Sequence, residues 1–518
     1  MNGIDDGAAA SHHDRRLTRE RYLALTDSIV YGPIKISPGD FCGAVLNKVY
    51  TLADAANFAG ADLLLTAANR TATYQVSEYV VKYKTQIREG TVIDATGIVM
   101  LPMRGKAIPG GHPVLLYGHG TVGIDDADAP SATIQSPNAW VGFEYSILRN
   151  YTAIGFVVVA PDYAGLGIFG VPHYYLVKFP IAYSMIDGVR SALVFGKNQG
   201  LTISRNTALM GHSQGGQAVL FTLEVYDGPE AYGKSSFDVK IVVPLAPAGS
   251  FRYNFYVGSI QYGQTIASFL FMYLYAAVRY NSNLTLDVML SPSAINTTLE
   301  NVESLNIDQL IDNNVFPVTN TEYFAPLAYN ATLNNLNGFI CFFQIFGFSG
   351  LPGCVGGLSP FDLTDFTLDP IPAEWQAQID EDSSGFSLVS KVPIRLINGN
   401  IDQIVSPLLT LPIAQKLAMN GANLVDETGT TLTLDYSFFA SEYQTLFNCT
   451  SPGYIIQCGY GHDEIIGAVD QYVPVVLSKV GLQAVPSEKN AKVAKKAGKK
   501  QPKKAMKMPL GKSPRSWY

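Results

Sequence analysis

Short apolar runs alternate with longer helical stretches between residues 113 and 248, and this alternation restricts the fold more than any other feature. The expected strands are Val114–Tyr117, Phe156–Ala160, Ala208–Met210 and Lys240–Leu245, and the expected helices are Ala182–Phe195 and Gln217–Tyr226. Apolar runs bounded by Gly, Pro or Asn are typical of buried parallel strands, because crossover helices cover both faces of such a sheet. The pattern therefore predicts an α/β fold with a doubly wound, mostly parallel sheet.

The alternation stops after Pro247 and resumes near residue 390, which indicates an insertion between strands of one sheet. The intervening residues are rich in Phe, Tyr, Leu and Asn and favour a mainly helical cap. After the insertion the pattern predicts, in order, a strand at Val392–Ile397, a helix at Leu408–Met419, a strand at Leu432–Phe439 and a helix at Glu464–Lys479. We therefore divide the chain into a polar leader (1–20), a first core segment (21–248), a cap or lid (249–388), a second core segment (389–482) and a basic tail (483–518).

Composition excludes several protein classes. With 47% hydrophobic and only 15% charged residues, the 518-residue chain is neither a disordered protein nor a coiled coil. The last 30 positions hold eleven of the 36 basic residues and no acidic one, so the other 488 positions carry 25 basic and 43 acidic residues, a formal charge of −18. An acidic body argues against a specific nucleic-acid partner. The basic tail is expected to be a solvating extension or to contact an anionic surface.

The segment Gly211-His212-Ser213-Gln214-Gly215 lies between an expected strand and an expected helix. A serine held on so tight a turn needs neighbours without side chains, which Gly211, Gly215 and Gly216 supply. This context predicts a nucleophile elbow with Ser213 as the nucleophile. The alternative is a glycine-rich turn without chemistry.

A serine nucleophile needs a base, and the chain offers seven histidines: His12, His13, His112, His119, His173, His212 and His462. Of these, His462 follows the last expected strand, where the chain order serine, acid, histidine places the base. His212 adjoins Ser213, and its side chain is expected to turn away. A surface histidine in a loop is the alternative for His462.

The orienting acid is predicted to be Asp402, because the turn Asn398-Gly399-Asn400-Ile401-Asp402 follows a buried strand at the edge of the sheet where catalytic groups collect. Asp463 and Glu464 adjoin His462 in sequence and are badly placed to bond its ring. The alternative for Asp402 is a structural role as the cap of the next helix.

Ester or amide hydrolysis also needs hydrogen-bond donors for the oxyanion. The backbone N–H of Gln214 is the first candidate, because it follows the nucleophile. The loop at Gly120 and Thr121 follows an expected strand and supplies the second, with the Thr121 hydroxyl as a further donor. An ordinary glycine turn is the alternative for this loop.

Taken together, these segments resemble the secretory lipase family, the lipase A type of fungal secreted enzymes and their bacterial relatives. The similar segments are Gly118-His119-Gly120-Thr121 with Asp128-Ala129-Pro130-Ser131, Ala160-Pro161-Asp162-Tyr163-Ala164-Gly165-Leu166-Gly167, Gly211-His212-Ser213-Gln214-Gly215-Gly216, Asn398-Gly399-Asn400-Ile401-Asp402 and Gly461-His462-Asp463-Glu464. The resemblance spans residues 20–480 and is weakest in the cap. It implies an α/β hydrolase with a helical cap, a Ser213, Asp402 and His462 triad, and triacylglycerol lipase activity without metal or organic cofactor.

Two departures from the family pattern stand out. Members often carry a Cys where this chain has Asp128, so a disulfide usual in that region is expected to be absent. The long interval between Asp402 and His462 suggests an inserted hairpin around Cys449 and Cys458.

Other functions compete with the lipase. A general short-chain esterase or an acyltransferase would share the fold and the triad. A serine peptidase of the prolyl oligopeptidase kind would ordinarily add a propeller, and a dehalogenase would carry Asp in place of Ser213. A non-catalytic adhesion relative is expected to have lost Ser213 or His462, and both are present.

Two apolar segments of the cap bear on the substrate. Ile266–Val278 is apolar all round and Gly338–Phe348 nearly so. They are expected either to line an acyl site for a lipid or small ester and meet a lipid surface, or to form the cap's own core. Neither reaches the length needed to span a bilayer.

Cysteines and sequons bear on the compartment. Cys341 with Cys354, and Cys449 with Cys458, are close enough in sequence to close small disulfide loops, and Cys42 is left over. Sequons begin at Asn69, Asn150, Asn283, Asn296, Asn330 and Asn448. They favour a secreted glycoprotein, as does the family resemblance. Because Met1–Arg21 has no apolar run of signal-peptide length, a cytoplasmic protein is the alternative.

Overall fold

The computed structural model describes residues 37–55, 57–134, 139–168, 170–249, 263–301, 371–383, 387–447, 449 and 452–482. The leader (1–20), the tail (483–518), the segment Gly338–Phe348 and the pair Cys341 and Cys354 lie outside these residues.

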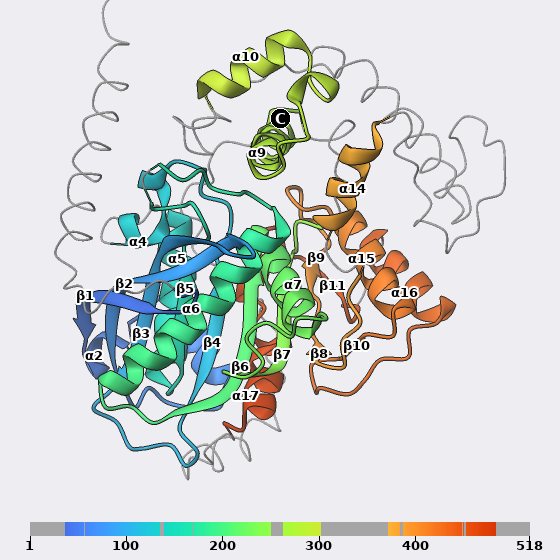
Figure 1. Ribbon diagram of the computed structural model, residues 1–518. Coiled ribbons are helices and arrows are strands. Elements are labelled where there is room, and N and C mark those ends of the chain that lie inside the picture. The colour runs from blue at the N-terminus through green and yellow to red at the C-terminus, as the bar shows by residue number, and fades with distance from the viewer. Residues whose placement is uncertain are drawn as a thin grey trace, which may run out of the picture.

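A mixed sheet of nine strands, in the order β1-β2-β3-β5-β4-β6-β7-β8-β10, forms the centre of the molecule (Figure 1). From β5 to β10 all neighbours are parallel, whereas β1, β2, β3 and β5 pair antiparallel. The strands are β1 (Phe41–Tyr50), β2 (Gln75–Arg88), β3 (Thr91–Met103), β4 (His112–Gly118), β5 (Val157–Pro161), β6 (Ile203–His212), β7 (Asp238–Leu245), β8 (Pro393–Ile394) and β10 (Asn423–Leu424). A separate pair joins β9 (Asn398–Gly399) to β11 (Ile456–Gln457) in parallel.

Helices cover both faces of the sheet. The helices α6 and α7 pack together on one face, and α5 and α17 pack with α3 on the other (Figure 1). The helices of the core are α2 (Leu52–Ala55), α3 (Ala61–Ala67), α4 (Pro130–Thr133), α5 (Ala139–Ala153), α6 (Lys178–Asn198), α7 (Gln214–Asp227), α15 (Pro407–Met419), α16 (Tyr436–Phe447) and α17 (Val473–Val480), with short 3-10 turns at η1 (Asp126–Asp128), η3 (Glu464–Gly467) and η4 (Val469–Gln471). This layered arrangement confirms the predicted fold class, an α/β hydrolase fold with a mostly parallel sheet.

The strand predicted at Leu432–Phe439 is wrong, because α16 begins at Tyr436. Asp435 explains the helix: its Oδ1 accepts hydrogen bonds from Phe438 N at 2.9 Å and Ser437 Oγ at 2.7 Å, which caps the first turn. The hairpin expected around Cys449 and Cys458 is likewise replaced by this helix, a loop and the short strand β11.

The helix predicted at Glu464–Lys479 is also broken into η3, η4 and α17. Pro474 stands in the first turn of α17, where proline is tolerated because that turn's N–H groups have no partner within the helix. A continuous helix through Pro474 would instead lose a backbone hydrogen bond.

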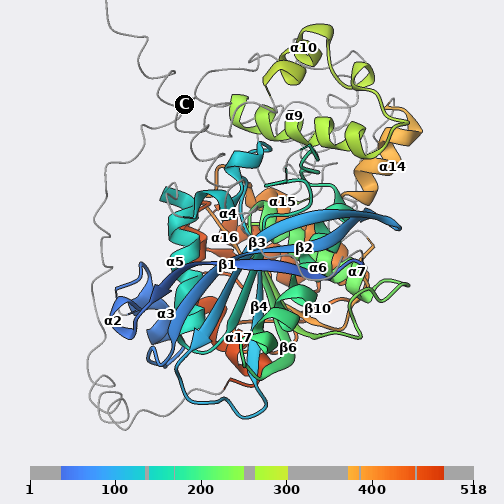
Figure 2. The same cartoon turned by 60° about the vertical axis from the view of Figure 1, so that its left-hand side comes forward.

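The described part of the predicted cap is built of helices: α9 (Gly263–Tyr280), η2 (Leu286–Val288), α10 (Pro292–Asn301) and α14 (Ala373–Glu381). Figures 1 and 2 show α9 and α10 above the edge of the sheet at which β4 and β6 end. The side chains of Leu270–Ala277 in α9 are buried in a second hydrophobic cluster, with Trp375 of α14 and Tyr174–Val177 of the core. This segment of α9 therefore packs both against α14 of the cap and against the core loop at Tyr174–Val177. No helix among the described residues is both long and apolar enough to cross a bilayer.

Candidate active site

Ser213 occupies the turn between β6 and α7 with φ 57° and ψ −118°. A positive φ is rare for a residue with a side chain and costs free energy, so the surrounding structure must hold it. Its N–H donates to Leu245 O at the end of β7, at 2.9 Å, and its carbonyl accepts from Gln217 N at 3.2 Å. The backbone therefore has the strained strand-to-helix turn that the sequence predicts.

The glycines around Ser213 are required by close backbone approach. A Cβ at Gly211 would lie 2.1 Å from Gly215 O, and one at Gly215 would lie 1.9 Å from Gly118 O. A Cβ at Gly216 would meet Leu245 O at 2.8 Å. Any side chain at these positions would push the turn away from β4 and β7, which explains why this motif keeps glycine on both sides of the serine.

His462 and Asp402 are brought together by the short ladder between β9 and β11. Asp402 follows β9 and His462 follows β11, and the two strands pair Ile456 with Asn398 in parallel. Both loops leave the same end of the ladder, and His462 Nδ1 lies 2.9 Å from Asp402 Oδ2. This hydrogen bond is the contact that a histidine base makes with its orienting acid.

Asp402 is nearly inaccessible, with 3% of its surface exposed. Its second oxygen, Oδ1, accepts from Ile404 N at 2.9 Å and Val405 N at 2.8 Å. These bonds go to the turn before α15, which begins at Pro407, so Oδ1 holds this turn and does not cap the helix as the alternative proposed. The other oxygen, Oδ2, bonds the histidine. Within the described part of the chain, the acid bonded to the ring of His462 is Asp402, and neither Asp463 nor Glu464 makes a hydrogen bond or ion pair with that ring.

Burial lowers the pKa of His462, but the negative charge of Asp402 and the hydrogen bond to it outweigh burial and raise the pKa above its ordinary value of 6.5. The described hydrogen bonds of His462 use Nδ1 and the carbonyl oxygen, so they leave Nε2 out. Nε2 is the nitrogen that would take a proton from a serine hydroxyl.

The raised pKa predicts the acidic limb of the pH profile. A base must be neutral to accept a proton, so hydrolysis is expected to fall as the pH drops through the pKa of His462 and His462 becomes charged. We therefore expect the acidic limb of kcat/KM, measured on a soluble ester, to have its midpoint above pH 6.5. A midpoint below that value would show that Asp402 does not stabilise the charged ring in solution.

The oxyanion candidates Thr121 and Gln214 contact the loop that carries His173 and Tyr175, which the sequence did not indicate as part of the site. Thr121 Oγ1 lies 2.9 Å from the hydroxyl of Tyr175, and the side-chain nitrogen of Gln214 lies 3.1 Å from His173 Nε2. Burial lowers the pKa of His173 to about 3, so this ring is neutral and accepts from Gln214. Tyr163, with φ 73°, donates from its hydroxyl to His119 O at 2.8 Å, next to Gly120.

Of the residues that hold the oxyanion loop, only Tyr163 could have been predicted from the sequence, because it lies in one of the segments that resemble the family. The neighbouring Asp162 is fully buried and accepts from Ser131 N at 2.9 Å, from Ser131 Oγ and from Thr96 Oγ1 at 2.7 Å. It thereby ties the Ala-Pro-Ser segment to β3. The partners of His173 and Tyr175 come from other loops, so no local pattern marks them.

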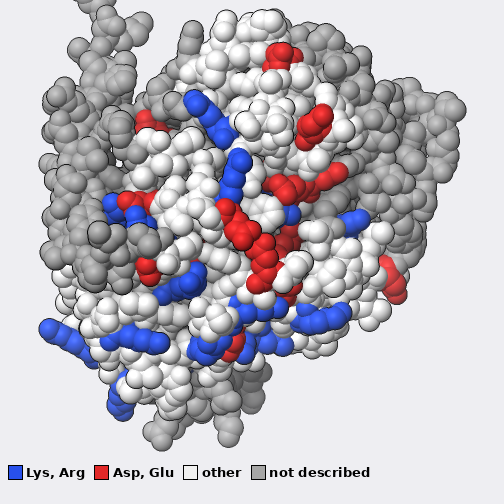
Figure 3. Space-filling view, viewed as in Figure 1, with Lys and Arg blue, Asp and Glu red and all other residues white. Residues whose placement is uncertain are grey.

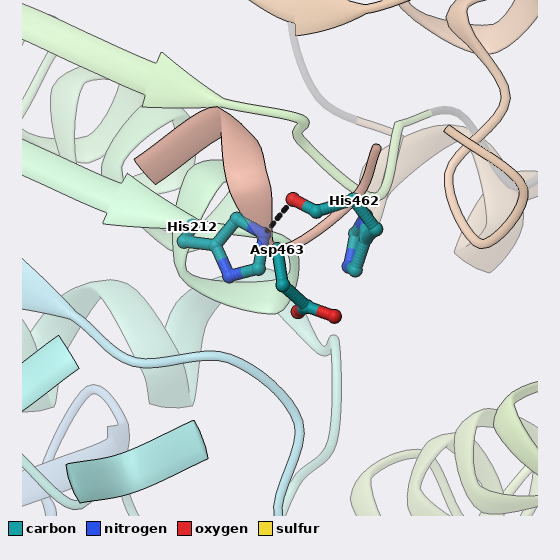
Figure 4. A group of neighbouring side chains, drawn as sticks. All are labelled: His212, His462 and Asp463. Atoms are coloured by element: carbon teal, nitrogen blue, oxygen red, sulfur yellow. Dashed lines mark hydrogen bonds between the residues drawn. The ribbon is translucent and has the colours of Figure 1, made fainter. Parts of the chain in front are cut away.

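His212 was expected to turn away, but its ring makes two contacts with the site. Nε2 lies 2.8 Å from the carbonyl oxygen of His462, and Nδ1 lies 3.2 Å from Oε1 of Glu144 in α5. Figure 4 shows the His212 ring directed at the backbone of His462, with the Asp463 carboxylate nearby.

Donor atoms of His212, His462 and Asp463 lie within 4.8 Å of one another, close enough in principle to hold a cation. Both ring nitrogens of His212 are already directed at oxygen atoms, and Nδ1 of His462 is bonded to Asp402. The cluster is therefore arranged as a hydrogen-bond network, and a cation could bind only by replacing some of these hydrogen bonds.

Acidic side chains gather near the middle of the face seen in Figure 3. A surface pocket of about 400 Å³ is lined by Lys178, Glu224, Asp227 and Glu230, among others. It lies at the C-terminal end of α7, whereas Ser213 precedes the N-terminal end. With 14 residues in α7, the two ends are about 20 Å apart at about 1.5 Å per residue. This pocket is separate from the candidate active site.

The cysteine and sequon predictions have mixed outcomes. Cys449 and Cys458 are joined by a disulfide, and Cys42 is a buried free thiol. Asn150 is fully buried, with its amide donating to Ala59 O at 3.1 Å, so this sequon cannot carry a glycan in the folded protein. The sequons at Asn69, Asn283 and Asn296 are exposed, and those at Asn330 and Asn448 lie outside the described residues.

Comparison with known proteins agrees with this geometry. Residues 133–228, which contain the elbow, match the sequence profile of the family described as secretory lipase. No curated protein matches the sequence.

Solved structures with a similar fold include the rice cell wall degrading esterase LipA from Xanthomonas oryzae, with 17% identity, TM-score 0.56 and coverage of 75% of this chain and 91% of that chain. A putative hydrolase from Legionella pneumophila has 16% identity and TM-score 0.57, covering 85% of this chain and 96% of its own. Candida antarctica lipase A has 14% identity and TM-score 0.52, covering 87% and 91%. The resemblance to the secretory lipase family is thus confirmed over the segment that carries the elbow, within a chain that has the α/β hydrolase fold of lipases and esterases.

Proposed function

We propose that this protein is a serine carboxylic-ester hydrolase that acts on lipid esters through an acyl-enzyme on Ser213. The observation that carries the proposal is the combination of a strained serine on a strand-to-helix turn with a histidine bonded to a buried aspartate at 2.9 Å. The strained φ of Ser213 costs free energy, which is typical of a functional site.

In the proposed reaction, Ser213 Oγ attacks the ester carbonyl carbon while Nε2 of His462 takes the hydroxyl proton. The negative charge on the carbonyl oxygen is stabilised by the N–H of Gln214, at the start of α7, and by the loop at Gly120 and Thr121. His462 then gives its proton to the departing alcohol. A water molecule, activated by the same histidine, hydrolyses the acyl-enzyme and restores Ser213.

The lipid substrate is supported by the family description and by the cap above the site. The family is described as secretory lipase, and one similar structure is a lipase. A general short-chain esterase is the second candidate. It is favoured by the burial of Leu270–Ala277, because these side chains of α9 are already packed against α14 and the core loop at Tyr174–Val177.

Secretion is part of the proposal, supported by the family description and the exposed sequons at Asn69, Asn283 and Asn296.

Covalent labelling tests the serine assignment, and a chain-length series tests the substrate. A fluorophosphonate is expected to modify one serine, and mass spectrometry of the digested protein should place the adduct on Ser213. Nitrophenyl esters of two to sixteen carbons and a triglyceride emulsion should then be hydrolysed with kcat/KM rising with chain length, by about fourfold for each methylene that becomes buried. Labelling elsewhere would overturn the mechanism, whereas a maximum at two to four carbons would leave the mechanism and make the protein a short-chain esterase.

A further inference from the structure

His212 lies between two hydrogen-bond acceptors. A neutral imidazole has one N–H donor and one acceptor nitrogen, so it can satisfy only one of two facing oxygen atoms. Here Nε2 faces the carbonyl oxygen of His462 at 2.8 Å, and Nδ1 faces the carboxylate of Glu144 at 3.2 Å. A carbonyl oxygen cannot donate, so Nε2 must carry a hydrogen. Nδ1 must carry one as well if Glu144 is ionised.

The site is closed to water, which makes an unmatched pair of acceptors costly. The side chains of His212 and Glu144 are only 4% and 8% exposed. An imidazole lone pair directed at a buried carboxylate would repel it without solvent to relieve the contact. A hydrogen on Nδ1 turns this repulsion into a hydrogen bond to Glu144, so the geometry places the additional proton on His212.

We propose that His212, as an imidazolium paired with Glu144, is a positioning residue that holds the loop of the base His462 in register with Ser213. This inference rests on the proposed hydrolase function. The contact runs from α5, through the residue preceding the nucleophile, to the backbone of the base. It therefore links the nucleophile and the base directly, which the bond between Asp402 and His462 does not do.

The extra proton also sets the local charge. With it, Glu144 and His212 together are neutral; without it, they carry one buried negative charge beside His462 and the oxyanion loop. A Cβ on Gly120 would lie 3.3 Å from Glu144 Oε1 and 3.5 Å from His212 Nδ1, so the pair adjoins that loop. A pair without this proton would both lack one hydrogen bond and oppose the charge that develops on the oxyanion.

Other ionisable groups face this pair and share its field. They are His462 and Asp463 from the loop before η3, Asp402 behind His462, His119 of the oxyanion loop, and the buried hydroxyls of Tyr117, Tyr145 and Tyr163, which lie near Glu144. Burial raises the pKa of Asp463, which keeps this neighbour from adding a full negative charge under acidic conditions.

Glu144→Gln is the informative variant. A glutamine amide can donate to Nδ1 of a neutral His212, which then still donates from Nε2 to His462 O. The network is thus preserved without the extra proton. We expect Glu144→Gln to stay within about tenfold of the wild-type kcat, measured with nitrophenyl butyrate, because the amide keeps both hydrogen bonds of His212. A larger loss of kcat in a variant with the wild-type melting temperature would overturn the proposal.

His212→Phe removes both hydrogen bonds while keeping a ring of similar size. We expect kcat to fall by about tenfold to a hundredfold with KM changed less than twofold, because the base moves and the substrate pocket does not. His112→Phe is the matched control: this buried histidine bonds Gly155 O at 2.8 Å at the opposite end of β4. It should lower the melting temperature without altering kcat. Wild-type kcat in His212→Phe would contradict the positioning role.

A spectroscopic measurement separates this inference from the hydrolase proposal. In protein labelled with ¹⁵N-histidine, the His212 signals, assigned by their loss in His212→Phe, should show both nitrogens protonated at the pH optimum. In Glu144→Gln one nitrogen should be unprotonated. A neutral His212 in the wild type would overturn the inference even if the ester assays succeed, and an imidazolium would support it even if Ser213 proved not to be the nucleophile.

Discussion

Ser213→Ala is expected to lower kcat for ester hydrolysis by about 10⁴-fold to 10⁶-fold, because the acyl-enzyme cannot form without the hydroxyl. Alanine keeps a Cβ at the strained position, with φ 57°, so the turn and the bonds to Leu245 and Gln217 remain. The loss should therefore appear in kcat with little change in melting temperature. Initial rates on nitrophenyl butyrate, combined with thermal unfolding, provide the measurement.

Ser191→Ala is the matched control for this variant. Its hydroxyl is buried in α6 and has no hydrogen-bond partner among the described residues. It should retain wild-type turnover. If Ser213→Ala kept its esterase activity, the nucleophile and the mechanism built on it would be wrong.

Asp402→Asn is expected to lower kcat by about 10⁴-fold through the tautomer of His462. The asparagine Oδ1 can still accept from Ile404 N and Val405 N, so the turn is preserved. Its amide nitrogen then faces Nδ1 of His462, which must accept a hydrogen bond there and carry its proton on Nε2 instead. A ring protonated on Nε2 cannot take the proton of Ser213.

The same substitution should also shift the acidic limb of kcat/KM. Without the charge of Asp402, the pKa of His462 should fall, so the residual activity should persist to lower pH. Asp463→Asn is the matched control. Its kcat should remain within about tenfold of the wild-type value, because the hydrogen bond to the ring of His462 in the described part of the chain comes from Asp402 and not from Asp463. Full activity in Asp402→Asn together with inactivity in Asp463→Asn would move the acid to Asp463.

The parallel half of the sheet and the elbow were predictable because their causes are local. Four expected apolar runs coincide with β4, β5, β6 and β7. Glycine is required at the elbow because a Cβ at any of the three positions would lie 1.9 to 2.8 Å from a backbone oxygen. Burial in a strand and close backbone approach each restrict the residue type at a single position, so both can be recognised in the sequence.

The antiparallel strands β1, β2 and β3 were not among the expected elements, and β2 shows why. It carries Glu78, fully buried, whose carboxylate pairs with Arg149 of α5 at 2.8 Å. A charged residue in a strand interrupts the apolar pattern, and the partner that makes its burial possible comes from a segment 71 residues away. The same reasoning applies to Glu144 and Tyr175, whose importance lies entirely in tertiary contacts.

The ladder between β9 and β11 has a consequence for the length of chain between the acid and the base. Two paired positions, Asn398 with Ile456 and Gly399 with Gln457, bring the two loops together. Hydrogen bonds from Ile401 N to Tyr460 O at 3.3 Å and from Gly459 N to Asn400 Oδ1 at 2.7 Å then hold the loops beyond the ladder. The chain between them, which contains β10, α16 and the disulfide, can therefore grow or shrink without changing the distance from Asp402 to His462. The interval of 60 residues is a region where evolution is free to add structure. In engineering terms, the turn at Asp426–Thr430, in which Thr428 and Thr430 are exposed, is a place to graft a peptide or a tag, since an enlarged turn there would leave the ladder intact.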